Sequence, residues 1–177
     1  MENLSVNTFN YVYKTYKTQL YNYVLKMVNN QTFTEDIVQV VFLKFYENLD
    51  GIKNRESSNF WIFKTARNEI YKHFKNKKIR VDQFNKDDAD TIEVASAVNV
   101  EIEYERGELY NLISKELENL PLEQKETYIL KEYSQLSYKE ISIITGADEN
   151  VLRKRLFDAK NKLVNRLSNI YMAKGEK

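Results

Sequence analysis

The sequence predicts an all-α protein made of two small helical domains joined by an acidic linker. Only 4 Gly and 1 Pro occur in 177 residues, whereas sheet-rich folds need many tight turns built from those residues. In several long segments apolar residues recur three or four positions apart, which is the spacing of one helical face. A hydrophobic content of 42% can form a packed core, and a charged content of 30% can cover its surface.

The composition excludes most enzyme chemistries. The chain has no cysteine and a single histidine, His73, which argues against thiolate or histidine metal sites and against a Ser-His relay. We therefore expect no catalytic residues, no metal and no cofactor. The N-terminus lacks a basic start followed by an apolar segment, and no window approaches the ~20 apolar residues of a membrane span. A cytoplasmic protein without membrane insertion is expected.

The N-terminal domain, residues 1–80, is predicted to contain three helices. The first covers Phe9–Met27. The second follows a break at Asn29 and Asn30, with Thr32 or Thr34 as its N-cap and Asp50 and Gly51 at its end. Its apolar stripe consists of Ile37, Val38, Val41, Phe42, Phe45 and Leu49.

The third helix is predicted to follow a polar loop, residues 53–59. Ser57, Ser58 and Asn59 in this loop are N-cap candidates. The helix has a basic outer face and an apolar stripe that consists of Phe60, Phe63, Ala66, Ile70 and Phe74.

Residues 81–107 form the predicted linker. Acidic residues dominate this segment and are opposed only by Lys86 and Arg106. Such a charge bias predicts a disordered or loosely helical connection. The segregation also explains a net charge of only +1, because the cations lie mostly in the helices on either side.

The C-terminal domain, residues 108–177, contains the clearest local signals. Ser137 and Glu140 have the spacing of a reciprocal capping box. Gly146 suits a left-handed C-cap, and Asp148 suits the N-cap of the next helix. Pro121 suits the first turn of an earlier helix. The predicted buried residues are Ile141, Ile144, Leu152, Leu156, Ala159 and Leu163.

Two helices around a short turn, with cations on the exposed face of the second, are typical of a helix-turn-helix that reads the DNA major groove. The alternative is an αα-hairpin whose basic face is simply solvated. The cations cluster in the second helix, and Phe157 lies outside its apolar stripe; both observations favour DNA. The expected DNA-facing residues are Asn150, Arg153, Lys154, Arg155, Phe157 and Lys160.

Taken in order, three segments resemble bacterial RNA polymerase sigma factors of the sigma-70 superfamily, extracytoplasmic-function type. They are TEDIVQVVFLKFYENLD, FWIFKTARNEIYKHFK and LPLEQKETYILKEYSQLSYKEISIITG. The resemblance implies that residues 1–80 are sigma region 2 and that residues 108–177 are sigma region 4. It also implies a protein that binds core RNA polymerase and promoter DNA to direct transcription initiation.

The resemblance assigns polymerase binding to Asp36 and Gln39 with the flanking apolar residues Val40 and Leu43. Val40 occupies a position where the family often has an acid. A polar edge beside an apolar stripe suits a partner helix, and a solvated helix face is the alternative from the residues alone.

For the melted minus-ten strand, the resemblance implies a helix with backbone-binding cations and a base-reading Asn68. Trp61 is either a DNA contact or a packing anchor. The preceding loop resembles the segment that holds a flipped-out base. The residues assigned to the minus-ten strand are Arg55, Ser57, Ser58, Asn59, Trp61, Lys64, Arg67, Asn68 and Lys72.

The expected minus-thirty-five element is duplex DNA, read by the C-terminal helix-turn-helix. The turn differs from the Pro-x-Gly-Thr-Val run common in the family, so the promoter sequence cannot be read from these residues. The linker either mimics nucleic-acid charge inside the polymerase or is a solvated tether, and an anti-sigma partner is a family possibility. The rival functions are a stand-alone helix-turn-helix regulator and a helical adaptor without a DNA role.

Overall fold

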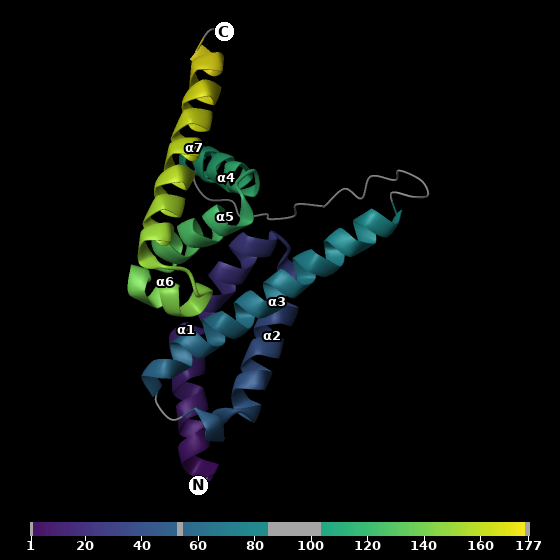
Figure 1. Cartoon of the computed structure of the whole chain (residues 1–177), viewed down its shortest axis with the longest axis vertical. Coiled ribbons are helices and arrows are strands. Elements are labelled where there is room, and N and C mark those ends of the chain that lie inside the picture. The colour runs from purple at the N-terminus through teal and green to yellow at the C-terminus, as the bar shows by residue number, and fades with distance from the viewer. Residues whose placement is uncertain (1, 53–54, 85–103, 176–177) are drawn as a thin grey trace. The chain divides into compact units, whose positions relative to one another are not determined.

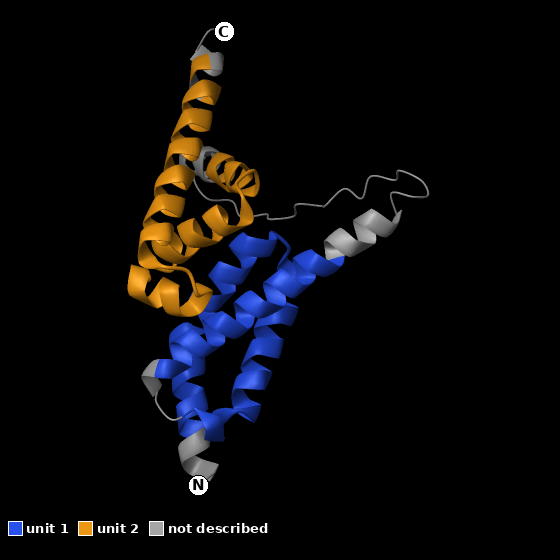
Figure 2. Cartoon of the chain, in the orientation of Figure 1, with its two compact units in different colours: residues 1–97 blue, residues 98–177 orange. Residues whose placement is uncertain are grey.

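The structure, a computed structural model, describes residues 2–52, 55–84 and 104–175, and all the regular elements in these ranges are helices (Figure 1). The chain divides into two compact units, Met1–Ala97 and Val98–Lys177 (Figure 2). Most of the predicted acidic linker, residues 85–103, lies outside the described residues.

Unit 1 is built from three helices that pack against one another. They are α1 (Glu2–Val28), α2 (Gln31–Glu47) and α3 (Arg55–Phe84), with a short 3-10 turn, η1 (Leu49–Gly51), after α2. Each helix buries one apolar face, which follows from the three-and-four spacing of its apolar residues. The buried residues are Val12, Leu20, Tyr23, Val24, Met27, Ile37, Val38, Val41, Phe42, Phe45, Ile62, Phe63, Ala66 and Ile70.

The predicted N-cap of α2 was wrong. The helix begins at Gln31, and the Asn30 side chain is the cap, because its Oδ1 accepts a hydrogen bond from the Phe33 N–H at 2.8 Å. Thr34, one of the predicted caps, is buried within the helix and donates its hydroxyl to the Asn30 carbonyl at 2.7 Å. With this cap, no acidic residue lies in the first turn of α2.

The predicted start of α3 was also wrong. The helix begins at Arg55, so Ser57, Ser58 and Asn59 are helical residues and not part of a loop before the helix. Its far end is Phe84, four residues beyond the predicted limit of the N-terminal domain. Of the predicted stripe, Phe63, Ala66 and Ile70 are buried; Phe60 and Phe74 are half-buried, and Ile62 is buried in addition.

Unit 2 is arranged along one long helix. The elements α4 (Tyr104–Glu118), α5 (Leu122–Tyr128) and α6 (Tyr138–Thr145) all pack against α7 (Glu149–Gly175). α5 continues into a π-helical turn, η2 (Ile129–Tyr133), which the sequence did not indicate. The buried apolar residues are Leu117, Leu120, Ile129, Leu130, Leu136, Ile141, Ile144, Leu152, Leu156, Ala159 and Leu163.

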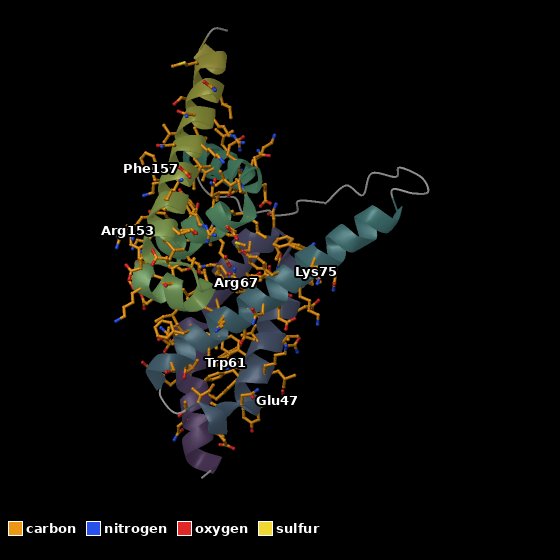
Figure 3. All side chains as sticks on the ribbon, in the orientation of Figure 1. Glu47, Trp61, Arg67, Lys75, Arg153 and Phe157 are labelled. Carbon is orange, nitrogen blue, oxygen red and sulfur yellow. The ribbon has the colours of Figure 1, made fainter. Side chains whose placement is uncertain are left out.

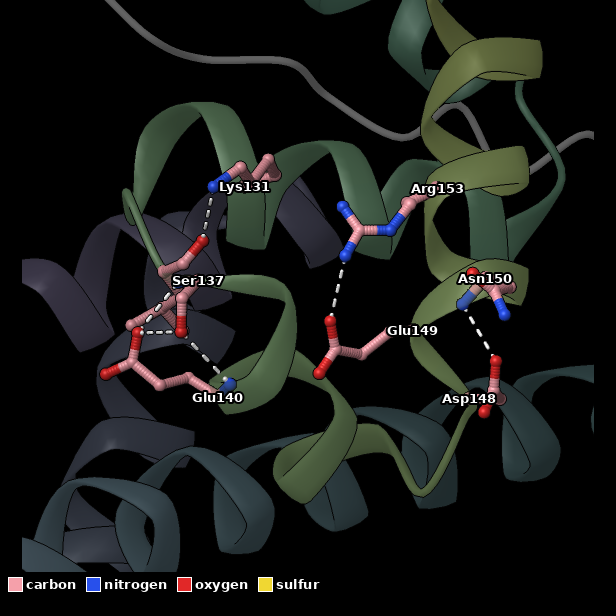
Figure 4. Close-up of polar contacts among 8 residues, drawn as sticks. Lys131, Ser137, Glu140, Asp148, Glu149, Asn150 and Arg153 are labelled. Atoms are coloured by element: carbon pink, nitrogen blue, oxygen red, sulfur yellow. Dashed lines mark hydrogen bonds and ion pairs between the residues drawn. The ribbon is translucent and has the colours of Figure 1, made fainter.

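The structure confirms the predicted caps of the helix-turn-helix. The Ser137 Oγ accepts from the Glu140 N–H at 3.2 Å, and the Glu140 Oε2 accepts from the Ser137 N–H at 2.7 Å, which completes the capping box. Gly146 ends α6 with φ 75°, in the left-handed region. The Asp148 Oδ1 accepts from the Asn150 N–H at 2.8 Å at the start of α7 (Figure 4).

Candidate nucleic-acid interface

The outer face of α7 is polar and cationic, as predicted. Asn150, Arg153, Lys154 and Lys160 are all exposed, and the Phe157 side chain is 64% exposed. The opposite side of the same helix carries the predicted buried stripe. Arg153 and Phe157 lie one helical turn apart (Figure 3), so a duplex that reaches one of them can reach the other.

Arg155 does not belong to this face. Its side chain is only 23% exposed and forms an ion pair with Glu123 of α5. This guanidinium joins α7 to α5, and the assignment of Arg155 to DNA stays a prediction. The helical period directs Arg155 towards α5, whereas Arg153 and Lys154 remain on the exposed face of α7.

Two exposed cations of α7 are already paired with acids. The Arg153 Nη2 lies 3.0 Å from the Glu149 Oε2, and the Lys160 Nζ lies 2.8 Å from the Glu132 Oε1. The hydrogen bond to Glu132 raises the pKa of Lys160. Lys154 makes no hydrogen bond or ion pair with any described residue.

α3 presents a second polar and cationic face. Lys64, Asn68 and Lys72 are exposed. The half-buried Arg67 places its guanidinium carbon 4.2 Å from the centre of the Tyr71 ring. The side chains of Lys64, Asn68 and Lys72 project from α3 at intervals of four residues, which aligns them along one side of the helix.

The remaining minus-ten candidates, at the start of α3, differ in exposure. Ser57 is exposed, but Ser58 is fully buried, and its Oγ has no hydrogen-bond partner among the described residues. Ser58 is therefore removed from the predicted DNA contacts. The half-buried Asn59 accepts the Phe60 N–H at 2.7 Å. The side chain of Arg55 lies outside the described residues.

Trp61 has a clear packing role. It is half-buried, and its ring lies 5.8 Å from that of Phe45 on α2. The sequence left Trp61 as either a DNA contact or a packing anchor, and the structure shows the packing contact between α2 and α3.

α2 presents a third face, which combines apolar and polar side chains. Asp36, Gln39, Val40 and Leu43 are all exposed. Leu43 is 56% exposed and Tyr46 is 54% exposed. Tyr46 follows Leu43 by three residues, which places it on the same side of α2.

No group of three or more His, Cys, Asp or Glu side chains among the described residues could hold a metal ion. None of the helices, over the portion that the structure describes, is long and apolar enough to cross a membrane.

Comparison with known families identifies both units. Sigma-70 region 2 matches residues 12–79, and Sigma-70 region 4 matches residues 110–163. The RNA polymerase sigma factor SigV of Bacillus subtilis (strain 168) is 32% identical over 145 residues, which cover 81% of each chain. The ECF RNA polymerase sigma factor SigM of the same organism is 24% identical and covers 88% of this chain and 93% of its own.

The chain belongs to the sigma-70 family, in its extracytoplasmic-function (ECF) type. Solved structures share its fold. The sigma factor RpoE, co-crystallised with the anti-sigma factor NepR from Bartonella quintana, has a TM-score of 0.72 at 21% identity, over 90% of this chain and 96% of the other. The structure of CnrH with the cytosolic domain of CnrY has a TM-score of 0.68 at 17% identity, over 94% and 96%.

Proposed function

We propose that this protein is a promoter-specificity subunit that binds core RNA polymerase and directs transcription initiation. The observation that carries the proposal is the occurrence of both sigma regions, in order, in one chain. The separate exposed faces of α2, α3 and α7 support one role each. A stand-alone regulator would need only the helix-turn-helix, and it would leave the α2 and α3 faces without a role.

Region 4 is proposed to bind duplex minus-thirty-five DNA through α7. A recognition helix contacts base edges from its N-terminal turns, while cations further along meet phosphates. Asn150 and Arg153 lie in the first two turns of α7 and are exposed, so they are assigned to base edges. Lys154 and Lys160 are assigned to phosphates, and Phe157 is assigned to an apolar base contact.

Region 2 is proposed to hold the melted minus-ten strand along α3. Single-stranded DNA needs cations for its backbone and polar or aromatic side chains for its unstacked bases. Lys64, Arg67 and Lys72 are assigned to the backbone, and the exposed Asn68 is assigned to a base. Ser57, Asn59, Trp61 and Arg55 lie at the start of the same helix and are assigned to the upstream end of the strand.

The α2 face is proposed to bind the polymerase. Val40 and Leu43 expose apolar surface that water does not favour, and Asp36 and Gln39 on the same face supply polar contacts. Helix-in-groove recognition combines such an apolar stripe with a polar edge. This assignment places the polymerase contact on a different helix from both DNA contacts.

The proposed partners follow from these roles. They are core RNA polymerase and promoter DNA, and the protein is expected in the cytoplasm, where both are found. Of two solved structures with the same fold, one contains the sigma factor RpoE with the anti-sigma factor NepR, and the other contains CnrH with the cytosolic domain of CnrY. An anti-sigma factor is therefore proposed as a further partner of this chain.

Reconstitution with core polymerase on genomic fragments tests the proposal. The expected result is a holoenzyme that starts transcripts at discrete positions, whereas core polymerase alone does not. The proposal is wrong if no holoenzyme forms or if no promoter-directed transcript appears.

A pair of variants separates the two roles of region 2. Asn68→Ala is expected to reduce promoter opening about tenfold, because a good base contact is worth ~1–3 kcal/mol, while core binding is retained. Leu43→Asp is expected to have the opposite pattern, in which core binding is weakened more than promoter opening. Opening is measured by permanganate reactivity of melted thymines, and core binding is measured by native gel titration. Equal loss of both by Asn68→Ala contradicts its assigned role.

A further inference from the structure

Tyr138, the first residue of α6, contacts cations from two other elements. The Arg153 guanidinium carbon of α7 lies 4.3 Å from the centre of its ring. The Lys131 Nζ of η2 lies 5.0 Å from the same centre. The electron-rich face of a tyrosine ring attracts both charges. One half-buried ring thus joins the helix before the turn to the helix that carries the proposed base contacts.

The other ends of these contacts are also held. The Arg153 Nη2 lies 3.0 Å from the Glu149 Oε2, one turn earlier on α7. The Lys131 Nζ donates to the Leu136 carbonyl at 3.0 Å, just before the capping box (Figure 4). Arg153 therefore has two contacts, with the Tyr138 ring at its guanidinium carbon and with the Glu149 carboxylate at Nη2.

Arg153 remains accessible to solvent despite these contacts. Its side chain remains 54% exposed. A ring stacked on the guanidinium covers a face, and the N–H donors lie in the plane at the edges. The edge that Glu149 does not occupy can still donate to a base. Lys154, the next residue, is exposed and has neither a ring contact nor an ion pair among the described residues.

We propose that Tyr138 is a positioning residue, which orders the Arg153 guanidinium before DNA arrives and so increases discrimination between promoter and other duplex. The proposal rests on the proposed function, since it assumes that α7 reads duplex DNA. A side chain already held in one conformation loses less freedom when it binds. Bidentate recognition of a guanine depends on the direction of the guanidinium plane.

Discrimination and overall affinity should respond differently to the loss of the ring. Binding to arbitrary duplex depends mainly on the number of phosphates that protein cations neutralise. Replacement of Tyr138 changes no charge, so the salt dependence of non-specific binding should stay the same. The preference for promoter depends on the direction of Arg153, so it should fall.

The test uses the reconstituted holoenzyme on a promoter fragment and on the same fragment with a scrambled minus-thirty-five element. Tyr138→Leu is expected to lower the ratio of the two affinities about two- to fivefold, from the usual strength of an exposed cation–π contact. Tyr138→Phe keeps the ring and is expected to keep the ratio. In an Arg153→Ala background, Tyr138→Leu is expected to have no further effect.

A measurement on the free protein tests the positioning itself, independently of DNA. The Cδ protons of Arg153 should show a ring-current shift in the NMR spectrum of wild type and of Tyr138→Phe, and Tyr138→Leu should abolish it. The absence of that shift in wild type would overturn the proposal. An equal loss of promoter preference in Tyr138→Phe would overturn it too, since the hydroxyl would then be responsible.

The remaining outcomes separate the two proposals. If Tyr138→Leu still lowers the ratio when Arg153 is alanine, the ring acts on folding or on DNA directly, and positioning is refuted. If wild type shows the ring-current shift but no promoter-directed transcript, the proposed function fails and the restraint of Arg153 stands.

Discussion

The turn of the helix-turn-helix depends on one glycine, and its substitution gives a quantitative prediction. Gly146 has φ 75°, which L residues with a side chain adopt at a cost of about 1–2 kcal/mol. A Cβ built at this position meets nothing within 4 Å. The cost of Gly146→Ala is therefore conformational, with no contribution from steric overlap.

The expected net effect combines two terms. Alanine reduces the freedom of the unfolded chain, which stabilises the folded state by about 0.4–1 kcal/mol. The left-handed strain opposes this, so Gly146→Ala should destabilise unit 2 by about 1 kcal/mol. Gly51 is a matched control, because a Cβ there also meets nothing within 4 Å, and its φ is not positive. Gly51→Ala should be neutral or slightly stabilising.

Thermal unfolding of the full chain measures both effects. The single tryptophan, Trp61, lies in unit 1, so its fluorescence follows that unit, and the helical circular dichroism follows both. For a unit of this size, 1 kcal/mol corresponds to about 4–8 °C in the unfolding midpoint. A Gly146→Ala midpoint equal to or above wild type would refute the reasoning, and a loss well above ~2 kcal/mol would mean that the Cβ does meet a neighbour.

Three further predictions concern unit 2. Ser137→Ala removes the hydroxyl of the capping box and should cost about 1 kcal/mol by urea unfolding, with little further loss when Glu140→Ala is added. Burial lowers the pKa of Lys125, so on raising the pH the folded state releases this proton before the unfolded state does. The unfolding free energy of wild type should therefore increase relative to that of Lys125→Met as the pH rises towards ~10.5. Parallel plots of unfolding free energy against pH for the two proteins would contradict this. Glu132→Gln should free Lys160 from its ion pair, so that binding to non-specific duplex becomes stronger and more dependent on salt. Fluorescence anisotropy measures this binding, and an unchanged slope of log affinity against log salt concentration would refute the prediction.

The helix-turn-helix shows how much local sequence can predict. The capping box, the left-handed glycine and the aspartate cap each involve residues at most four positions apart, so the signal and the structure occupy the same segment. The buried stripe of α7 was predicted in full for the same reason, since helical period alone decides which side of a helix is apolar.

The start of α2 shows where local signals are ambiguous. Asn29, Asn30, Thr32 and Thr34 are all good N-cap residue types, and they lie within six positions. The choice of Asn30 leaves Thr34 buried against the rest of unit 1. Packing therefore selected among caps of similar intrinsic strength.

The sequence by itself determined the helical class, the two sigma regions, and the exposed faces of α2, α3 and α7. The helical class and the exposed faces depend on spacing within one helix, and each helix carries its own pattern. The two sigma regions were expected from the resemblance of three sequence segments to a known family. Only the tertiary structure decided that Ser58 is buried, that Arg155 pairs with Glu123, and that the Tyr138 ring contacts Arg153. Such contacts join residues as many as 32 positions apart, and the packing of neighbouring helices, which no single-helix pattern encodes, brings their side chains together.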